Sequence, residues 1–284
     1  MKLALVIFSI LFISGCSIDQ MLVRASTPMI EGGVEALNHE TDLELAEESI
    51  PANLNMLMGM INLDPDNAQL HTFAAQAFYG LSYGFNEDNR PQRASSFYLR
   101  GRQHGLRALE ISGAKNLMDS PISDFEEQIS HLDEDDVAAM FWTASCWAKW
   151  IDMHRDDTQA IAQLARATAL MQRVIDLDET FYYGGAHMYF GVYYGSRSPM
   201  LGGNFEKSVQ HFDRAREITN GKLLIPDLLQ AQYLSRQQQD RNDFHQRLTA
   251  VTNAPDDLMP ELGLQNEIAK RKARMLLMKE SEWF

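Results

Sequence analysis

The sequence predicts an all-α protein made of stacked helical hairpins, and three observations support this fold class. Apolar residues recur at helical spacing along nearly every segment, whereas strict alternation of apolar and polar residues is sustained nowhere. Residues that favour helices fill the segments, and short loops rich in Gly, Pro, Asn and Asp separate them. A degenerate repeat of small and large residues runs along the chain. We therefore expect a tetratricopeptide-like α-solenoid that ends in a capping helix at residues 262–279.

Residues 1–15 have the features of a bacterial lipoprotein signal peptide. Lys2 supplies a positive charge, residues 3–12 form an apolar run too short to span a bilayer, and Ile-Ser-Gly precedes Cys16 as in a lipobox. We expect the mature chain to begin at an acylated Cys16 and to lie outside the cytoplasm. Ser17 follows this cysteine, which favours the outer membrane, facing the periplasm. An uncleaved anchor or a chance match is the alternative.

Two regions follow the signal peptide. Residues 16–38 are mixed in composition and contain Gly32-Gly33, so we expect the lipidated Cys16 and a tether there, joined to a single helical domain at residues 39–284. Predicted helix starts are capping boxes at Thr41 with Glu44 and Ser123 with Glu126, and first-turn prolines at Pro51, Pro226 and Pro260. The acidic residues 133–136 suit the first turn of the next helix.

The repeat determines the predicted architecture. The second helix of a tetratricopeptide hairpin fits closely between its neighbours, so it carries a small residue, a large one four positions later and another small one three further on. The segments that follow this spacing are Ala94-Tyr98-Gly101 and Ser208-Phe212-Ala215, and in degraded form Asn53-Leu57-Met60, Ala167-Met171-Val174 and Phe244-Leu248-Val251. One hairpin can bury only one face. Stacked hairpins therefore leave a concave surface or an internal channel.

Charge and cysteine content exclude several classes of protein. The net charge of −14 argues against nucleic acid as a partner and against electrostatic attraction to anionic lipid. We therefore expect the acyl anchor alone to hold the protein at the membrane. Cys146 has no partner for an intrachain disulfide once Cys16 is acylated, and its place in a Trp-rich helix predicts a small apolar core residue.

Residues 181–205 are the segment richest in aromatic side chains, with five of the nine tyrosines between positions 182 and 194. On a regular helix, one stripe would contain Tyr183, Ala186, His187, Phe190 and Tyr194. Tyr182, Tyr189, Tyr193 and the following Arg197 would point more nearly the other way. One set can pack the hairpin while the other faces a cavity. The alternative is that all these aromatic side chains form the contact between hairpins.

No motif for catalysis, metal binding or a cofactor stands out. The eight histidines are scattered, HExxH and paired CxxC motifs are absent, and the Gly-Gly pairs are not followed by Lys-Ser or Lys-Thr. Paired carboxylates are too numerous in so acidic a chain to indicate a site. We therefore expect a protein that is not an enzyme, with no catalytic residues, no metal and no cofactor.

Residues 181–205 contain three short distinctive elements, Gly-Ala-His, Ser-Pro and Leu-Gly-Gly-Asn. Further elements outside this segment are Pro51-Ala-Asn-Leu, the turn at residues 64–67, residues 98–102, 142–150, 177–179 and 264–269, and Asp240-Arg241 ahead of Phe244. In these elements the chain resembles the T-component (TatT) lipoproteins associated with TRAP transporters. The sequence departs from the pattern at several small positions and at Lys149, where a small residue is expected in the aromatic helix.

The resemblance implies a periplasmic, lipid-anchored protein of tetratricopeptide-like hairpins that forms homotrimers with a pore in each subunit. It also implies a partner, the solute-binding P-component of a TRAP system, and a ligand that is apolar or an organic acid. Carried over to this sequence, the expected pore-lining residues are Tyr182, His187, Tyr189, Tyr193, Arg197 and Met200. A scaffold lipoprotein for envelope assembly is the alternative function, and an envelope enzyme is a distant third.

Overall fold

The computed structural model describes residues 18–284, and this part of the chain is helical with no strand. The α-helices are α2 Ile18–Ala25, α3 Thr27–His39, α4 Leu43–Leu63, α5 Ala68–Leu81, α6 Pro91–Ile111, α7 Ile122–Ser130, α8 Val137–Asp152, α9 Thr158–Ala162, α10 Leu164–Asp178, α11 Phe181–Gly195, α12 Phe205–Ile218, α13 Ile225–Leu229, α14 Arg241–Thr252, α15 Gly263–Met278 and α16 Glu280–Trp283. Two π-helical turns, η1 Ser82–Asn86 and η4 Gln230–Ser235, and three 3₁₀ turns, η2 Glu134–Asp136, η3 Pro199–Leu201 and η5 Pro260–Leu262, complete the secondary structure. The predicted all-α fold class is confirmed.

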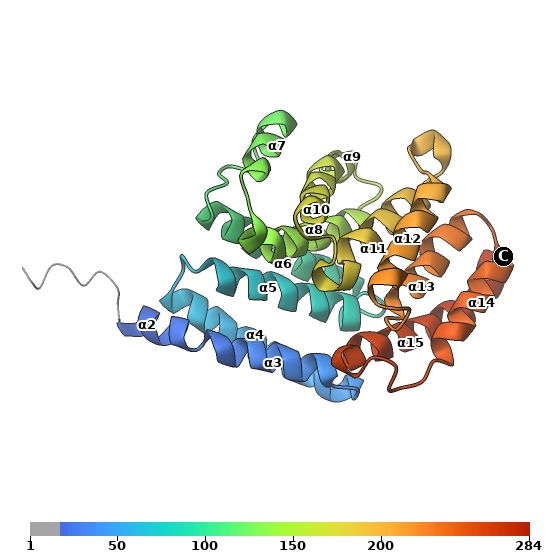
Figure 1. Ribbon diagram of the computed structural model, residues 1–284, viewed down its shortest axis with the longest axis horizontal. Helices are drawn as coiled ribbons and strands as arrows, with labels where there is room; N and C mark the ends of the chain where they lie inside the picture. The colour runs from blue at the N-terminus through green and yellow to red at the C-terminus, as the bar shows by residue number, and fades with distance from the viewer. Residues whose placement is uncertain (1–17) are drawn as a thin grey trace, which may run out of the picture.

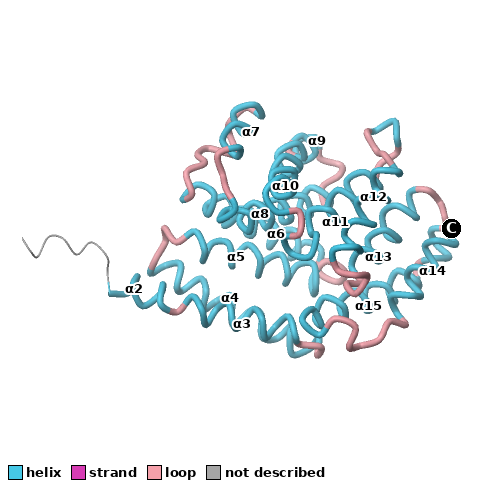
Figure 2. Tube along the Cα trace, viewed as in Figure 1, coloured by secondary structure: helices cyan, strands magenta, loops and turns pink. Residues whose placement is uncertain are grey.

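Several pairs of successive helices, among them α4–α5, α5–α6 and α11–α12, pack as hairpins (Figure 1, Figure 2). The pairs α5–α6 and α11–α12 make the most extensive contacts, and α8 packs against α5, α6 and α10. The main hydrophobic core lies around α6, α8, α10 and α11, with Trp147 and Met140 fully buried in it. A second core joins α4 and α5 to α15 through Leu264 and Ile268.

Four of the five repeat segments lie at tight helix contacts. Their central large residues, Tyr98, Met171, Phe212 and Leu248, are buried. The small residue Gly101 shows why size matters, because a Cβ placed there would lie 2.5 Å from Cys146 Sγ of α8. The fifth segment differs: Leu57 is buried, but Asn53 is exposed, because α4 is an outer helix.

The helix predicted at residues 262–279 forms as α15, and it links the two ends of the described chain. It contacts α14 on one side and α3 and α4 on the other, so the helices curve round and meet there (Figure 1). Polar contacts fix the junction: Asn266 Oδ1 accepts from the Leu224 amide at 2.9 Å, and Gln265 Nε2 donates to Asn38 Oδ1 at 2.8 Å. The predicted cap therefore closes the curve of the solenoid.

The region predicted as a tether is helical from Ile18 onward. Helices α2 and α3 cover residues 18–39, and α3 continues through Gly32-Gly33. Contacts with α4, α15 and η5 hold them in place, with Val23 buried. The predicted signal peptide and the lipidation site Cys16 lie outside the described residues. Among residues 18–284, no helix has both the length and the apolar character needed to cross a bilayer.

Several predicted helix starts are displaced. Asp42, and not Thr41, caps α4, because its side chain accepts from the amides of Glu44 and Leu45. Pro51 lies inside α4, which continues because Ile50 and Leu54 on either side are buried in the core. The capping box at Ser123 is also wrong, since α7 begins at Ile122 with Pro121 at its N-cap. Pro226 and Pro260 do occupy first turns, and the acidic residues 133–136 form the capped turn before α8.

Candidate functional site

A cavity of about 670 Å³ lies between α8, α10, α11 and η4 and is partly open to solvent. Its walls are mostly apolar, and seven of the nine tyrosines line it: Tyr79, Tyr83, Tyr182, Tyr183, Tyr189, Tyr193 and Tyr233. Burial raises the pKa of Tyr79, Tyr189 and Tyr233, so their hydroxyl groups stay neutral at physiological pH. The size suits a small organic molecule, and the walls offer apolar rings with hydroxyl groups at their ends.

A break in α11 directs two of these tyrosines toward the cavity. Tyr182, Tyr183 and Gly184 adopt left-handed backbone conformations, with φ of 45°, 60° and 76°. Such a conformation costs about 1–2 kcal/mol for each residue other than glycine, so the surroundings must hold it. The Tyr182 ring packs edge-on against Trp142 at 4.6 Å between centroids, and its hydroxyl accepts from Gln265 Nε2 at 3.3 Å. The regular helix resumes at Gly185, so Tyr183 leaves the stripe predicted for it and faces the cavity.

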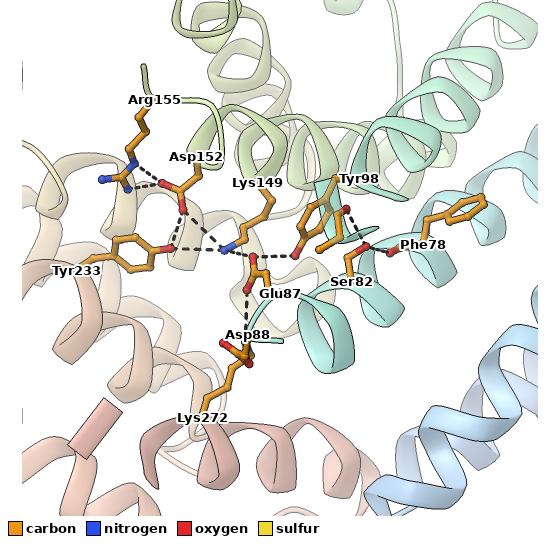
Figure 3. A network of polar contacts seen from close by, with 11 residues as sticks. Phe78, Ser82, Glu87, Asp88, Tyr98, Lys149, Asp152, Arg155, Tyr233 and Lys272 are labelled. Carbon is orange, nitrogen blue, oxygen red and sulfur yellow. Dashed lines mark hydrogen bonds and ion pairs between the residues drawn. The ribbon is translucent and has the colours of Figure 1, made fainter. Parts of the chain in front are cut away.

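One corner of the cavity is polar and centres on Lys149 of α8 (Figure 3). Lys149 Nζ lies 2.5 Å from Glu87 Oε1 and 3.9 Å from Asp152 Oδ2. Burial alone would lower the pKa of Lys149, but the Glu87 carboxylate, with Tyr233 and Asp152, outweighs it and holds that pKa well above the ordinary value. Lys149 is therefore a permanent cation in this corner.

The neighbours of Lys149 neutralise the corner. Tyr233 donates to Asp152 Oδ2 at 3.0 Å, and Arg155 Nε donates to Asp152 Oδ1 at 2.7 Å. Lys272 of α15 lies 2.8 Å from Asp88 Oδ2 and 3.4 Å from Glu87 Oε2 (Figure 3). Three cations thus face three carboxylates, and the two π-helical turns bring Tyr83 and Tyr233 to the same place. Such turns are frequent at functional sites.

Arg197 contributes a different kind of charge to the cavity wall. Its guanidinium donates from Nε and Nη2 to the Tyr193 carbonyl at 3.0 and 2.7 Å and lies 3.7 Å from the centre of the Tyr193 ring. Within residues 18–284 it forms no ion pair with a carboxylate. A cation that faces an apolar cavity without a counter-ion can pair with the carboxylate of a ligand.

The six residues expected to line a pore separate into two groups. Tyr182, Tyr189, Tyr193 and Arg197 lie along the cavity. His187 faces α12, because its Nδ1 lies 3.0 Å from His211 Nδ1 and its Nε2 donates to Glu179 at 3.1 Å. Met200 is 95% exposed at the tip of η3, whereas its neighbour Leu201 lines the cavity.

Sequence reasoning missed the polar corner because its members come from separate segments: Tyr83 from η1, Lys149 and Asp152 from α8, Tyr233 from η4 and Lys272 from α15. In the sequence, Lys149 is the residue that indicates such a corner, because a lysine within an apolar helix needs a buried counter-ion.

Comparison with known proteins gives one result that covers most of the chain. A family model described as TRAP transporter T-component matches residues 39–284. No curated protein matches the sequence. The matched region includes every element that lines the cavity, and of the described residues 18–284 it leaves out α2 and nearly all of α3. The chain therefore belongs to the TRAP transporter T-component family.

Proposed function

We propose that this T-component is a binding accessory of a TRAP-type transport system, without catalysis, and that its cavity accepts a small organic acid with an apolar body. The observation that carries this proposal is the tyrosine-lined cavity with Arg197 on its wall, where Arg197 forms no ion pair with a carboxylate of residues 18–284. A rigid apolar wall holds a hydrocarbon body weakly and reversibly, and one cation selects a carboxylate head. These properties suit a solute that must be passed on.

The proposed setting is the periplasm. Cys16 would carry the acyl anchor, in the outer membrane, and the body would meet the solute-binding P-component and pass solute through an internal pore, as a homotrimer. What supports this setting is the signal-peptide pattern ahead of Cys16 together with membership of the T-component family. Purification of the tagged protein from solubilised envelopes tests the partner. The solute-binding protein should be the main protein recovered; recovery of outer-membrane assembly proteins in its place would favour the scaffold.

The ligand class can be tested with two probes of equal chain length, octanoate and octanol. Octanoate should bind more tightly by calorimetry, because only its carboxylate can pair with Arg197. The variant Arg197→Met should weaken octanoate binding about tenfold, which corresponds to one charge-assisted hydrogen bond, and leave octanol unchanged. Met200→Ala is the matched control, since Met200 lies away from the cavity and should change neither. If Arg197→Met weakens the binding of octanoate and octanol equally, the result would argue against a carboxylate subsite.

A further inference from the structure

An apolar stripe runs along the exposed side of α2 and the first turn of α3. It consists of Ile18, Met21, Leu22, Ala25 and Met29, whose spacing of three, four, seven and eleven residues from Ile18 places them on one helical face. The large members are strongly exposed, Ile18 at 74%, Met21 at 64%, Leu22 at 59% and Met29 at 80%. We call this set the N-terminal stripe.

The opposite side of the same helices is docked on the protein, so the direction of the stripe is fixed. Val23 is 4% exposed and belongs to the core shared with α4 and α5. Arg24 Nε lies 2.8 Å from Asp64 Oδ2, at the end of α4. In α3, Ile30 and Leu37 also pack on this core. The stripe therefore points away from the body because the other face is occupied.

The position of the stripe in the chain indicates what covers it. Ile18 is two residues after Cys16, and two residues of extended chain span at most about 7 Å. Helix α2 also lies at the extremity of the molecule, beyond the ends of α3 and α4 (Figure 1). An acyl group on Cys16 would thus bring the start of the stripe to the surface of the bilayer. The net charge of −14 means that the contact would depend on apolar burial and not on attraction to anionic headgroups.

We propose that the N-terminal stripe lies in the interfacial region of the membrane and forms a second attachment next to the acyl anchor. This inference rests on the proposed acylation of Cys16. A single flexible anchor would leave the body free to rotate, whereas a helix fixed both to lipid and to α4 sets one orientation. The cavity then has a constant direction relative to the membrane surface.

The test compares two exposed methionines in the acylated full-length protein on phosphatidylethanolamine–phosphatidylcholine vesicles. A spin label is placed at Met21→Cys in the stripe or at Met278→Cys, which is 74% exposed at the far end of α15. The buried Cys146, whose pKa is raised by burial, should not react with the label. When the protein binds vesicles, the accessibility of the spin label to a water-soluble nickel chelate should fall at least threefold at position 21. It should stay unchanged at position 278. If the label is equally accessible at both positions on vesicles, the proposed contact of the N-terminal stripe with the membrane is overturned.

Two further outcomes separate this inference from the anchor and from self-association. If the acylated protein does not float with vesicles, the proposed acyl anchor is overturned, and so is the proposed membrane contact of the N-terminal stripe. The unacylated Cys16→Ser protein provides the second control, because the label at position 21 should be accessible in solution. Protection there, together with a lower molecular mass in Met21→Gln by ultracentrifugation, would assign the stripe to a contact between copies and overturn the lipid assignment.

Discussion

Lys149 shows how a single residue can organise a site that its own helix does not reveal. Its side chain is 17% exposed and lies between Glu87 from the turn after η1 and Asp152 one turn further along α8. Charges so placed lose most of their hydration, and they are stable only as a matched set. The lysine that departs from the family pattern is thus the centre of the polar corner.

Replacement of Lys149 by methionine should therefore destabilise the fold. The variant Lys149→Met keeps the volume but leaves Glu87 and Asp152 without their shared cation. We expect a loss of about 2–3 kcal/mol in urea unfolding, below the 3–5 kcal/mol typical of a broken buried pair, because Lys272 and Arg155 still compensate. Adding Glu87→Gln should restore part of the loss.

The control for this substitution is Lys115→Met, at an exposed lysine outside the corner. It should change the free energy of unfolding by less than about 0.5 kcal/mol. Equal effects of the two methionine variants would mean that the corner contributes nothing specific to stability.

At the scale of an element, α11 combines two requirements that a regular helix cannot meet together. Its regular part must pack on α12, where Phe212 of α12 lies against Gly191. Its first turn must direct Tyr182 and Tyr183 into the cavity, and the left-handed turn at residues 182–184 does this. Gly184 is suited to the third position, because a Cβ there would lie 2.9 Å from Ile218 Cδ1.

Gly184→Ala should accordingly destabilise the protein by about 1–3 kcal/mol, through its positive φ and the contact with Ile218. The matched control is Gly32→Ala, in the interior of α3, where nothing lies within 4 Å of the added carbon. That substitution should stabilise by about 0.5–1 kcal/mol, because alanine favours the helix. Thermal unfolding measures both, and the same sign for both would contradict the role given to the turn.

At the scale of the whole molecule, two histidine pairs bridge the two most extensive hairpins. His71 Nδ1 lies 2.9 Å from His104 Nδ1 between α5 and α6, and His187 Nδ1 lies 3.0 Å from His211 Nδ1 between α11 and α12. Nε2 of His71 donates to the Pro65 carbonyl oxygen, and Nε2 of His187 donates to the Glu179 carboxylate. In the neutral pairs, His104 and His211 are therefore the donors across the hairpins.

Acid should weaken both hairpins. Burial, with the neighbouring His71 and Arg100, lowers the pKa of His104 to about 4, and burial with His187 and Lys207 lowers that of His211 to about 4. A histidine with a folded-state pKa below its unfolded value near 6.5 binds fewer protons when folded. The contribution of such a histidine to the free energy of unfolding is therefore fully present above about pH 6.5 and is lost as the pH falls toward 4. We expect the free energy of unfolding to fall by about 1 kcal/mol for each pair between pH 7 and pH 5.

Urea unfolding at both pH values measures this loss, and His104→Phe with His211→Phe should reduce it. His131→Phe is the control, since His131 is exposed and should leave the pH dependence unchanged. Glu179 titrates in a separate window, because Arg214 and His187 lower its pKa to about 2 and its contribution is lost only below about pH 4.5. A pH dependence confined to that lower window would contradict the role of the histidines.

The sequence by itself determined the helices, most of the tight repeat positions and the family, because periodicity, helix propensity and residue size act locally. It also indicated Tyr182, Tyr189, Tyr193 and Arg197, which lie along the cavity. Local signals failed where a neighbour decides: Pro51 stays inside α4, and residues 18–39 fold as helices, because each is held by packing against distant elements. Only the tertiary structure assembled the polar corner and turned His187 toward His211, since these contacts join residues far apart in the chain and a helix face acquires its surroundings only when its neighbours dock.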